Sequence, residues 1–395
     1  MFTKNLFLSA LAVASLVSAQ SSKVCQEDSN SINSEADIDK IASCQSLSGD
    51  VVIGEDIQHV SLDKLQSVGG NFVADNAANL VGITIPNLQT IKGEFRLQKC
   101  QSLQTISAPA LTKTGKITWI ALALTSFTAK ISEAQSVTIS DTKLTSLDGI
   151  DLKNVNRFDV NNNQYLKSVT MNLRTVTEAL SMGFNAKSIA ISFPALIWSN
   201  NMTITGAGSF NFPTLQHVNG SMNFLNTSVT SIACKNLTVI EQTLAFIGND
   251  KVTELDFPIL TQIGGGFKIH NNSQLVDING FPKLKQVDGA IDFVGNFKNA
   301  SLPSLEDVRG GFNLQTTEEF DCSDFSAARD DKVIKGDSFV CKSKESNPTT
   351  ADGTPGADGK TNTTGTSGGN RNGGSGLVGI SALLGIFITA ISFVF

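Results

Sequence analysis

The sequence has few of the side chains that most often carry catalysis and metal binding. Its 395 residues include three histidines, two tryptophans and one tyrosine. His59, His217 and His270 are far apart, and no histidine or cysteine has the spacing of a metal site. No serine has the strand-turn-helix context of a hydrolase nucleophile. We therefore predict no metal, no cofactor and no catalytic residue.

An excess of positive charge is also missing. The chain has 30 Lys and Arg against 36 Asp and Glu, a net charge of −6. A nucleic-acid surface needs clustered basic residues, so no nucleic-acid partner is predicted. The glycine clusters at 69–70 and 264–266 are not followed by Lys-Ser/Thr, which excludes a phosphate-binding loop of that type.

The first nineteen residues have the layout of a secretory signal. Lys4 supplies a positive start, an apolar run follows from Leu6 to Leu16, and small residues precede Gln20. A membrane-spanning helix needs about 20 apolar residues, more than this run provides. We expect residues 1–19 to be removed.

The last residues have the pattern of a glycosylphosphatidylinositol (GPI) attachment signal. Residues 377–395 carry no charge, and small polar residues fill 365–376. A transmembrane helix usually keeps basic residues on its cytoplasmic flank, whereas a GPI signal has small residues, a polar spacer and an apolar tail. The attachment candidates are Ser367, Gly368, Asn370 and Asn372. Residues 368–395 are then a removed propeptide.

In a secreted protein the Asn-x-Ser/Thr sequons are acceptors for N-glycosylation. The predicted sites are Asn201, Asn219, Asn226, Asn236, Asn271, Asn299 and Asn362. Six of them fall between residues 201 and 299, which predicts a sugar-coated half.

A repeat of about 22 residues runs through most of the chain. Seven of the nine prolines lie in a Pro-x-Leu motif, at Pro86, Pro109, Pro194, Pro213, Pro258, Pro282 and Pro303. Weaker copies begin at Asp63, Ser132, Ile150, Met171 and Lys235. The units between Ser132 and Val176 are the most degenerate.

Each unit predicts a glycine corner followed by a half-buried strand. Apolar residues two places apart, such as Phe95 and Leu97 or Phe267 and Ile269, have the period of a strand with one face buried. The outward residues between such pairs include Val73, Arg96, Asn223, Lys268, Asp292 and Asn313. An asparagine recurs just after the strand, at Asn76, Asn163, Asn226 and Asn271. Stacked, these asparagines are expected to form a ladder.

A unit of this size cannot close a core alone, so the units must stack. Successive strands then lie ~4.8 Å apart. The prediction is an all-β fold, a right-handed parallel β-solenoid of about twelve coils. A helical leucine-rich repeat is the alternative, which the missing 3.6-residue period disfavours.

The spacing N-x-x-L-x-x-I-x-x-P-x-L-x-x-I-x-G-x-F-x-I resembles the β-helix of receptor L-domains. With the signal peptide, sequons and GPI tail, the chain resembles the fungal GPI-anchored cell-wall organisation proteins, a group that includes sporulation-specific wall proteins. The resemblance extends from Cys25 to Cys341 and through the tail. It implies a role in building the wall and its mannoprotein layer, and a location at the plasma membrane and in the wall.

The solenoid restricts the pairing of the six cysteines. Cys25 and Cys44 precede the clear repeats, and Cys322 and Cys341 follow them, so a disulfide is expected at each end. About six coils separate Cys100 from Cys234, roughly 29 Å, which is too far for a bond. Cys100 and Cys234 are expected to be buried free thiols. A disulfide between Cys44 and Cys100 remains the alternative for Cys100.

An enzymatic function is a further alternative, because some polysaccharide-cleaving enzymes are parallel β-helices. Glycoside hydrolysis needs two carboxylates at a defined separation, and the outward row mixes signs without clustering them. Asp141, Asp148, Asp151 and Asp159 are close in sequence. We interpret them as a solvated face and predict no enzyme.

The expected organisation is a solenoid over residues 20–342, followed by a flexible stalk over 343–367, which is too polar to bury a core. The expected partners are wall polysaccharide or wall mannoproteins, with the membrane reached through the GPI lipid. A receptor-like module that binds a glycan or peptide, or a structural spacer, remains an alternative. Repeats from Asp63 to Met171 lack sequons, so a binding face is expected there.

Overall fold

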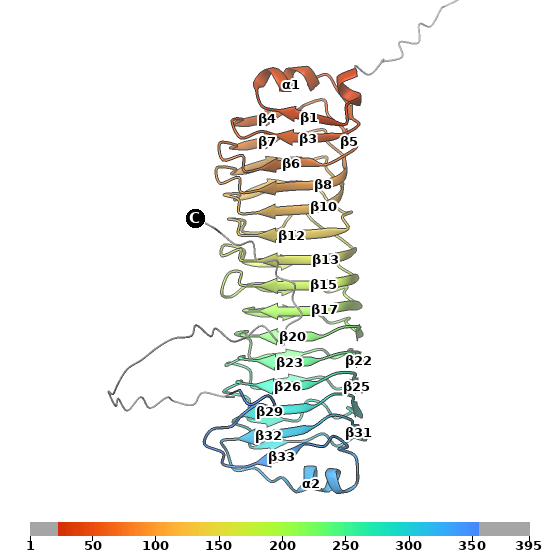
Figure 1. The fold of residues 1–395 in the computed structure, drawn as a ribbon, viewed down its shortest axis with the longest axis vertical. Coiled ribbons are helices and arrows are strands. Elements are labelled where there is room, and N and C mark those ends of the chain that lie inside the picture. Colours follow the sequence, from red (N-terminus) through yellow and green to blue (C-terminus); the bar gives the residue numbers. More distant parts are fainter. Residues whose placement is uncertain (1–22, 355–395) are drawn as a thin grey trace, which may run out of the picture. The chain divides into compact units, whose positions relative to one another are not determined.

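The computed structural model describes residues 23–354, and over this range the chain is a parallel β-solenoid of about 13 turns (Figure 1). The predicted fold class is confirmed, with close to the expected number of coils. Residues 1–19, the GPI candidates Ser367, Gly368, Asn370 and Asn372, and the sequon at Asn362 lie outside the described residues. Over the described range, no helix is both long and apolar enough to span a membrane.

One long parallel sheet of 22 strands runs the length of the described unit. Its strands are β1 (Ser29–Ile32), β2 (Ser46–Leu47), β3 (Asp50–Ile53), β5 (Ser67–Val68), β6 (Phe72–Asp75), β8 (Thr90–Gln98), β10 (Lys113–Ile120), β12 (Ser136–Ser140), β13 (Asn154–Asn161), β15 (Thr175–Gly183), β17 (Trp198–Thr205), β19 (His217–Val218), β20 (Met222–Leu225), β22 (Val239–Ile240), β23 (Leu244–Ile247), β25 (Gln262–Ile263), β26 (Phe267–His270), β28 (Gln286–Val287), β29 (Ile291–Gly295), β31 (Asp307–Val308), β32 (Phe312–Thr316) and β33 (Phe339–Lys342).

Shorter parallel sheets form the returning side of the coils. They comprise β4 (His59–Ser61), β7 (Gly82–Thr84), β9 (Thr105–Ser107) and β11 (Ser126–Thr128); β14 (Ser168–Thr170), β16 (Ala190–Ser192) and β18 (Ser209–Asn211); β21 (Ser231–Ala233) and β24 (Glu254–Asp256); and β27 (Asp277–Ile278) and β30 (Asn299–Ala300). The helices are the 3-10 turn η1 (Lys23–Gln26), α1 (Glu35–Ile41) and α2 (Ser323–Asp330).

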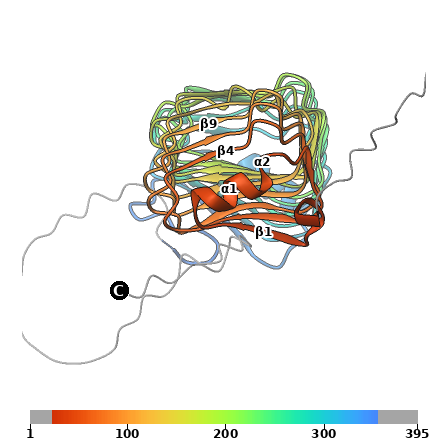
Figure 2. The same ribbon diagram turned by 90° about the horizontal axis from the view of Figure 1, so that it is seen from above.

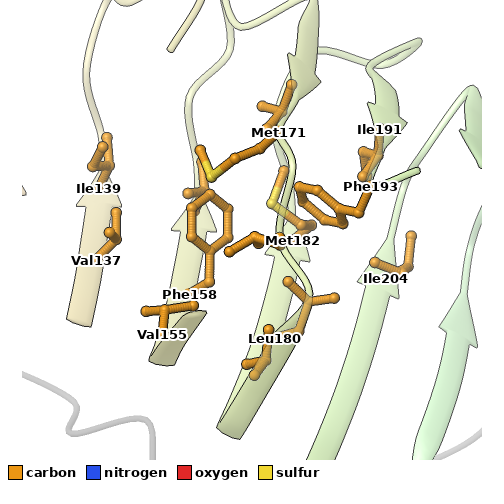
Figure 3. Packing of buried hydrophobic residues seen from close by; sticks show 14 of the residues in the cluster. Val137, Ile139, Val155, Phe158, Met171, Leu180, Met182, Ile191, Phe193 and Ile204 are labelled. Carbon is orange, nitrogen blue, oxygen red and sulfur yellow. The ribbon is translucent and has the colours of Figure 1, made fainter. Parts of the chain in front are cut away.

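The apolar pairs of the repeat point into the interior, as the period-2 pattern predicts. Phe267 and Ile269 are both 0% exposed, and Phe267 pairs in register with Leu244 on one side and Ile291 on the other. The degenerate middle is filled in the same way: Figure 3 shows Phe158 and Phe193 in one interior, with ring centroids 5.8 Å apart. The core is therefore one continuous column.

Both ends of the column are closed. Helix α1 lies across the N-terminal coils, as the view from above shows (Figure 2), and buries Ile38 and Ile41. At the other end α2 buries Phe325, whose ring lies 4.7 Å from that of Phe312. Covered ends keep the strand edges of the terminal coils from pairing with other chains.

The predicted disulfides are present at these ends. Cys25 bonds to Cys44 and Cys322 bonds to Cys341. Because Cys44 is paired with Cys25, the alternative Cys44–Cys100 bond is excluded. Cys100 and Cys234 are free and buried, and burial raises their pKa values to about 11 and about 12.

An asparagine ladder exists, but mostly one residue later than predicted. Of the four asparagines named above, Asn163 alone is in it. Asn76, Asn226 and Asn271 occupy the preceding turn position, where the backbone has positive φ values of 57°, 50° and 54°. The buried polar residues of the ladder form two runs, Thr142–Asn163–Asn185 and Thr227–Asn249–Asn272. Asparagine suits both positions, for left-handed backbone and for amide hydrogen bonding, so the sequence did not separate them.

Candidate binding face

The outward-pointing residues of the long sheet form a row along one face of the solenoid, and its members are half-buried or buried. We call it the outer row, the residues that lie between the two inward residues of each strand. In register along the sheet it consists of Val52, Val73, Arg96, Thr118, Thr138, Asp159, Ser181, Thr203, Asn223, Ala245, Lys268, Asp292 and Asn313. The six residues predicted from the sequence to point outward are all members.

The middle of the outer row is polar and almost uncharged. From β10 to β20 its members are hydroxyl or amide residues, apart from Asp159. Neighbouring members also bond to one another, as when Asn223 Nδ2 donates to Thr203 Oγ1 at 3.4 Å. Side chains of this kind offer donors and acceptors to a neutral, hydroxyl-rich ligand.

Asp159 is the exception in this middle section. It is partly buried, and burial raises the pKa of its carboxyl group, while nearby Arg157 acts in the opposite direction. The amide of Asn161 donates a hydrogen bond to it. A carboxyl group with a raised pKa is a feature of acid catalysts, but glycoside hydrolysis requires a second carboxyl group facing it.

The other aspartates named from the sequence lie on different parts of their coils. Asp141 is in the turn after β12, while Asp148 and Asp151 are on the segment that returns from β12 to β13. Asp151 accepts hydrogen bonds from the backbone and side-chain nitrogens of Asn172, at 3.1 to 3.3 Å. Within the described range, no three His, Cys, Asp or Glu side chains come together in a way that would hold a metal ion.

At the C-terminal end the outer row is covered, which the sequence did not predict. Residues 343–354, which we call the strap, follow β33 and extend the folded unit past Lys342. Asn313 Nδ2 donates to Thr349 O at 3.0 Å, and Thr349 N donates to Gln315 Oε1 at 3.1 Å. The strap has too few apolar residues to form a core of its own, but its polar groups can still form hydrogen bonds with a polar face of the solenoid. Residues 355–367 lie outside the described residues.

Asp292 is the centre of the contact between strap and sheet. Its Oδ2 accepts from the Ala351 backbone N–H at 3.1 Å, its Oδ1 accepts from Asn313 Nδ2 at 2.7 Å, and His270 Nε2 lies 3.1 Å away. Burial raises the pKa of Asp292, but His270, Asn313 and the Ala351 amide together outweigh burial, so the pKa is lower than usual. Asp292 and Asn313 are both 4% exposed, so these two predicted outward residues are not solvated.

The sequon asparagines that lie within residues 23–354 are accessible to solvent. Asn201, Asn219, Asn226, Asn236 and Asn299 are exposed and Asn271 is half-buried. Asn201 is the exposed residue of β17, and Asn226 and Asn271 follow β20 and β26. The outer face from β3 to β15 therefore carries no sequon.

The architecture of the described residues defines the class of protein. A parallel β-solenoid with a disulfide at each end is a rigid rod made in an oxidising compartment. What it offers to partners is a long outer face.

Comparison with known proteins identifies the family. The chain is 36% identical to protein ecm33 of Aspergillus fumigatus over 88% of both chains. It is 34% identical to the cell wall mannoprotein PST1 of Saccharomyces cerevisiae, covering 78% of this chain and 70% of that one. A cell surface GPI-anchored protein of Arthroderma benhamiae is also 34% identical, over 89% of this chain and 90% of the relative. No family model and no solved structure matches.

The chain therefore belongs to the family of fungal Ecm33-type cell-surface and cell-wall proteins. The resemblance stated from the sequence is confirmed. Its location is the cell surface and the cell wall, as the relatives' names state for them.

Proposed function

We propose that this protein is a non-enzymatic, GPI-anchored glycoprotein that organises the fungal cell wall by binding wall polysaccharide along the outer face of its solenoid. The observation that carries the proposal is the sequon-free outer row from β10 to β15, where Thr118, Thr138 and Ser181 carry hydroxyl groups and Asp159 is the one ionisable member. Wall polysaccharides are neutral and rich in hydroxyl groups, so such a row matches them in charge and in hydrogen bonding. The relatives' names, which describe wall and surface proteins, support the location.

In this proposal the chain is organised as the sequence predicts. The signal 1–19 is removed, the solenoid begins at residue 20, and the lipid is attached at one of Ser367, Gly368, Asn370 and Asn372. Sugars on the sequons between 201 and 299 keep one half of the rod hydrated. The sequon-free half is left to contact the wall.

The test is binding of the secreted ectodomain, residues 20–366, to isolated β-glucan, chitin and mannan, with reducing ends measured in the same samples. We expect saturable binding to at least one polymer without new reducing ends. New reducing ends would refute the non-enzymatic assignment and direct attention to Asp159. Failure to bind any of the three would refute polysaccharide binding and favour a wall mannoprotein as the partner.

A further inference from the structure

Two exposed aromatic side chains stand next to the outer face. Tyr165 is 57% exposed and Phe184 is 64% exposed; along the described chain the next most exposed large hydrophobic side chain is Val276, at 37%. The remaining phenylalanines of the described residues are buried or partly buried in the column. Tyr165 follows β13 and Phe184 follows β15, on consecutive coils whose turns lie side by side in Figure 1.

The backbone at Phe184 makes this residue type costly there. Its φ is 54°, in the left-handed region, as it is at the matching turn positions of neighbouring coils. Those positions hold Asn162 on one side and Gly206 on the other, which adopt the left-handed region more readily. A bulky residue costs roughly 1–2 kcal/mol there, and its exposed ring adds nothing to the core. A strained and exposed residue of this kind points to a function outside the fold.

Both aromatic residues are held on rigid turns. Asn163, two residues before Tyr165, and Asn185, directly after Phe184, are ladder residues whose side chains bond to each other at 3.2 Å. The Asn185 amide also donates to Val160 O at 2.8 Å. Between the two turns, Gln164 Nε2 donates to Phe184 O at 2.6 Å. Because the two turns are already ordered, less conformational entropy is lost when a ligand binds.

The surroundings match a neutral ligand with apolar faces. The outer-row residues of these coils, Asp159 and Ser181, lie on the strands that end at the two turns. Asn162 and Gln164 add exposed amide groups. No sequon lies on these coils, since the first one in the chain is Asn201.

We propose that Tyr165 and Phe184 form a stacking platform for a β-linked glucopyranose chain, as found in β-glucan or chitin. This proposal rests on the polysaccharide binding proposed above and names the site and the sugar class. In a β-linked glucopyranose ring the large substituents are equatorial, so axial C–H groups make both faces apolar, and such faces pack on aromatic rings. The axial hydroxyl of mannose interrupts one face. The two coils are ~4.8 Å apart along the rod, and Tyr165 lies three residues past Asn162, the residue that matches Phe184, so the proposed platform crosses the two turns obliquely.

The test compares ectodomain variants (residues 20–366) in binding to insoluble β-1,3-glucan, chitin and mannan. Phe184→Asn removes the ring and installs the residue that the preceding coil has at this turn, so folding is preserved. Tyr165→Gln removes the second ring. Phe184→Tyr keeps a ring and serves as the rescue, and Val276→Ser removes an exposed apolar side chain elsewhere. Thermal unfolding of each variant checks the fold.

We expect the Asn and Gln variants each to weaken binding to β-glucan or chitin about tenfold, while Phe184→Tyr and Val276→Ser bind like the parent. Equal binding by the parent and the Phe184→Asn, Tyr165→Gln double variant would overturn the platform and leave the proposed function standing. Parent binding to mannan alone would overturn the sugar class. If the parent binds none of the polymers, the proposed function fails, and the platform with it.

Discussion

Replacing Asn163 by alanine tests the asparagine ladder directly. Asn163 is 0% exposed. Its Oδ1 accepts from Thr142 N at 3.0 Å and from Thr142 Oγ1 at 2.7 Å. Its Nδ2 donates to Ile139 O at 3.0 Å and to Asn161 O at 2.9 Å. Alanine would leave the backbone N–H and the hydroxyl of Thr142 without this acceptor, in a place that water does not reach.

Each buried group left unsatisfied costs about 1–3 kcal/mol. Two such groups on Thr142 predict a loss of about 2–6 kcal/mol in the free energy of unfolding. The adjacent Asn162→Gly variant is the matched control: Asn162 is exposed, with a φ of 60° that glycine adopts freely, so we expect a change of less than about 0.5 kcal/mol.

The assay is denaturant unfolding of the secreted ectodomain, followed by intrinsic fluorescence and far-UV circular dichroism. Hydrogen exchange at the Thr142 amide adds a local measurement, because that amide should lose protection in Asn163→Ala and keep it in Asn162→Gly. An Asn163→Ala protein as stable as the parent, or equal losses in both variants, would refute the reasoning.

Three further predictions follow from the core, the thiols and the strap. Phe267→Ala should lower the unfolding free energy by about 3–5 kcal/mol, since the ring is 0% exposed; an unchanged melting temperature would contradict this. Cys100 and Cys234 should resist thiol-labelling reagents until the protein unfolds, because both are buried and their pKa values are raised; rapid labelling of the native protein would count against it. The lowered pKa of Asp292 stabilises the folded state above the ordinary aspartate pKa of about 3.9, and this contribution is lost as the pH falls through the lowered value. We expect the Ala351 amide to exchange faster in Asp292→Asn at neutral pH, and an unchanged exchange rate would argue against Asp292 as the residue that holds the strap.

The core was predictable from the sequence because the solenoid repeats one simple rule in every coil. Inward residues alternate with outward ones, so the positions of Phe95, Leu97, Phe267 and Ile269 follow from a period of two. The positions of the cysteines relative to the repeats were enough to predict both terminal disulfides. Even the degenerate units obey the rule, since Phe158 and Met182 fill the same column.

Features that depend on contact between distant segments were not predictable. The strap has the composition of a linker, and nothing in residues 343–354 shows that Asp292 and Asn313 lie ready to bind it. Both residues point outward as predicted, and the strap that buries them was not foreseen. The ladder was misplaced because Asn226 and Asn271 are followed by a polar residue, and only the backbone shows which of the two points inward.

The aromatic pair was overlooked for a related reason. In a chain whose phenylalanines nearly all fill the core, one more phenylalanine attracts no notice. Aligning the turn positions would have found it, because Phe184 is the one large apolar residue among the left-handed positions after β6 to β26, which otherwise hold Asn, Asp, Gly, Lys or Ala. The useful signal is thus a residue type that departs from its own column in the repeat.

The central claim is that the solenoid binds wall polysaccharide and does not cleave it. The most direct measurement is a binding isotherm of the ectodomain, residues 20–366, on purified wall β-glucan, with the supernatant assayed for new reducing ends. The account predicts saturable binding and an unchanged level of reducing ends over a long incubation. Release of oligosaccharide, or the absence of saturable binding, would contradict it.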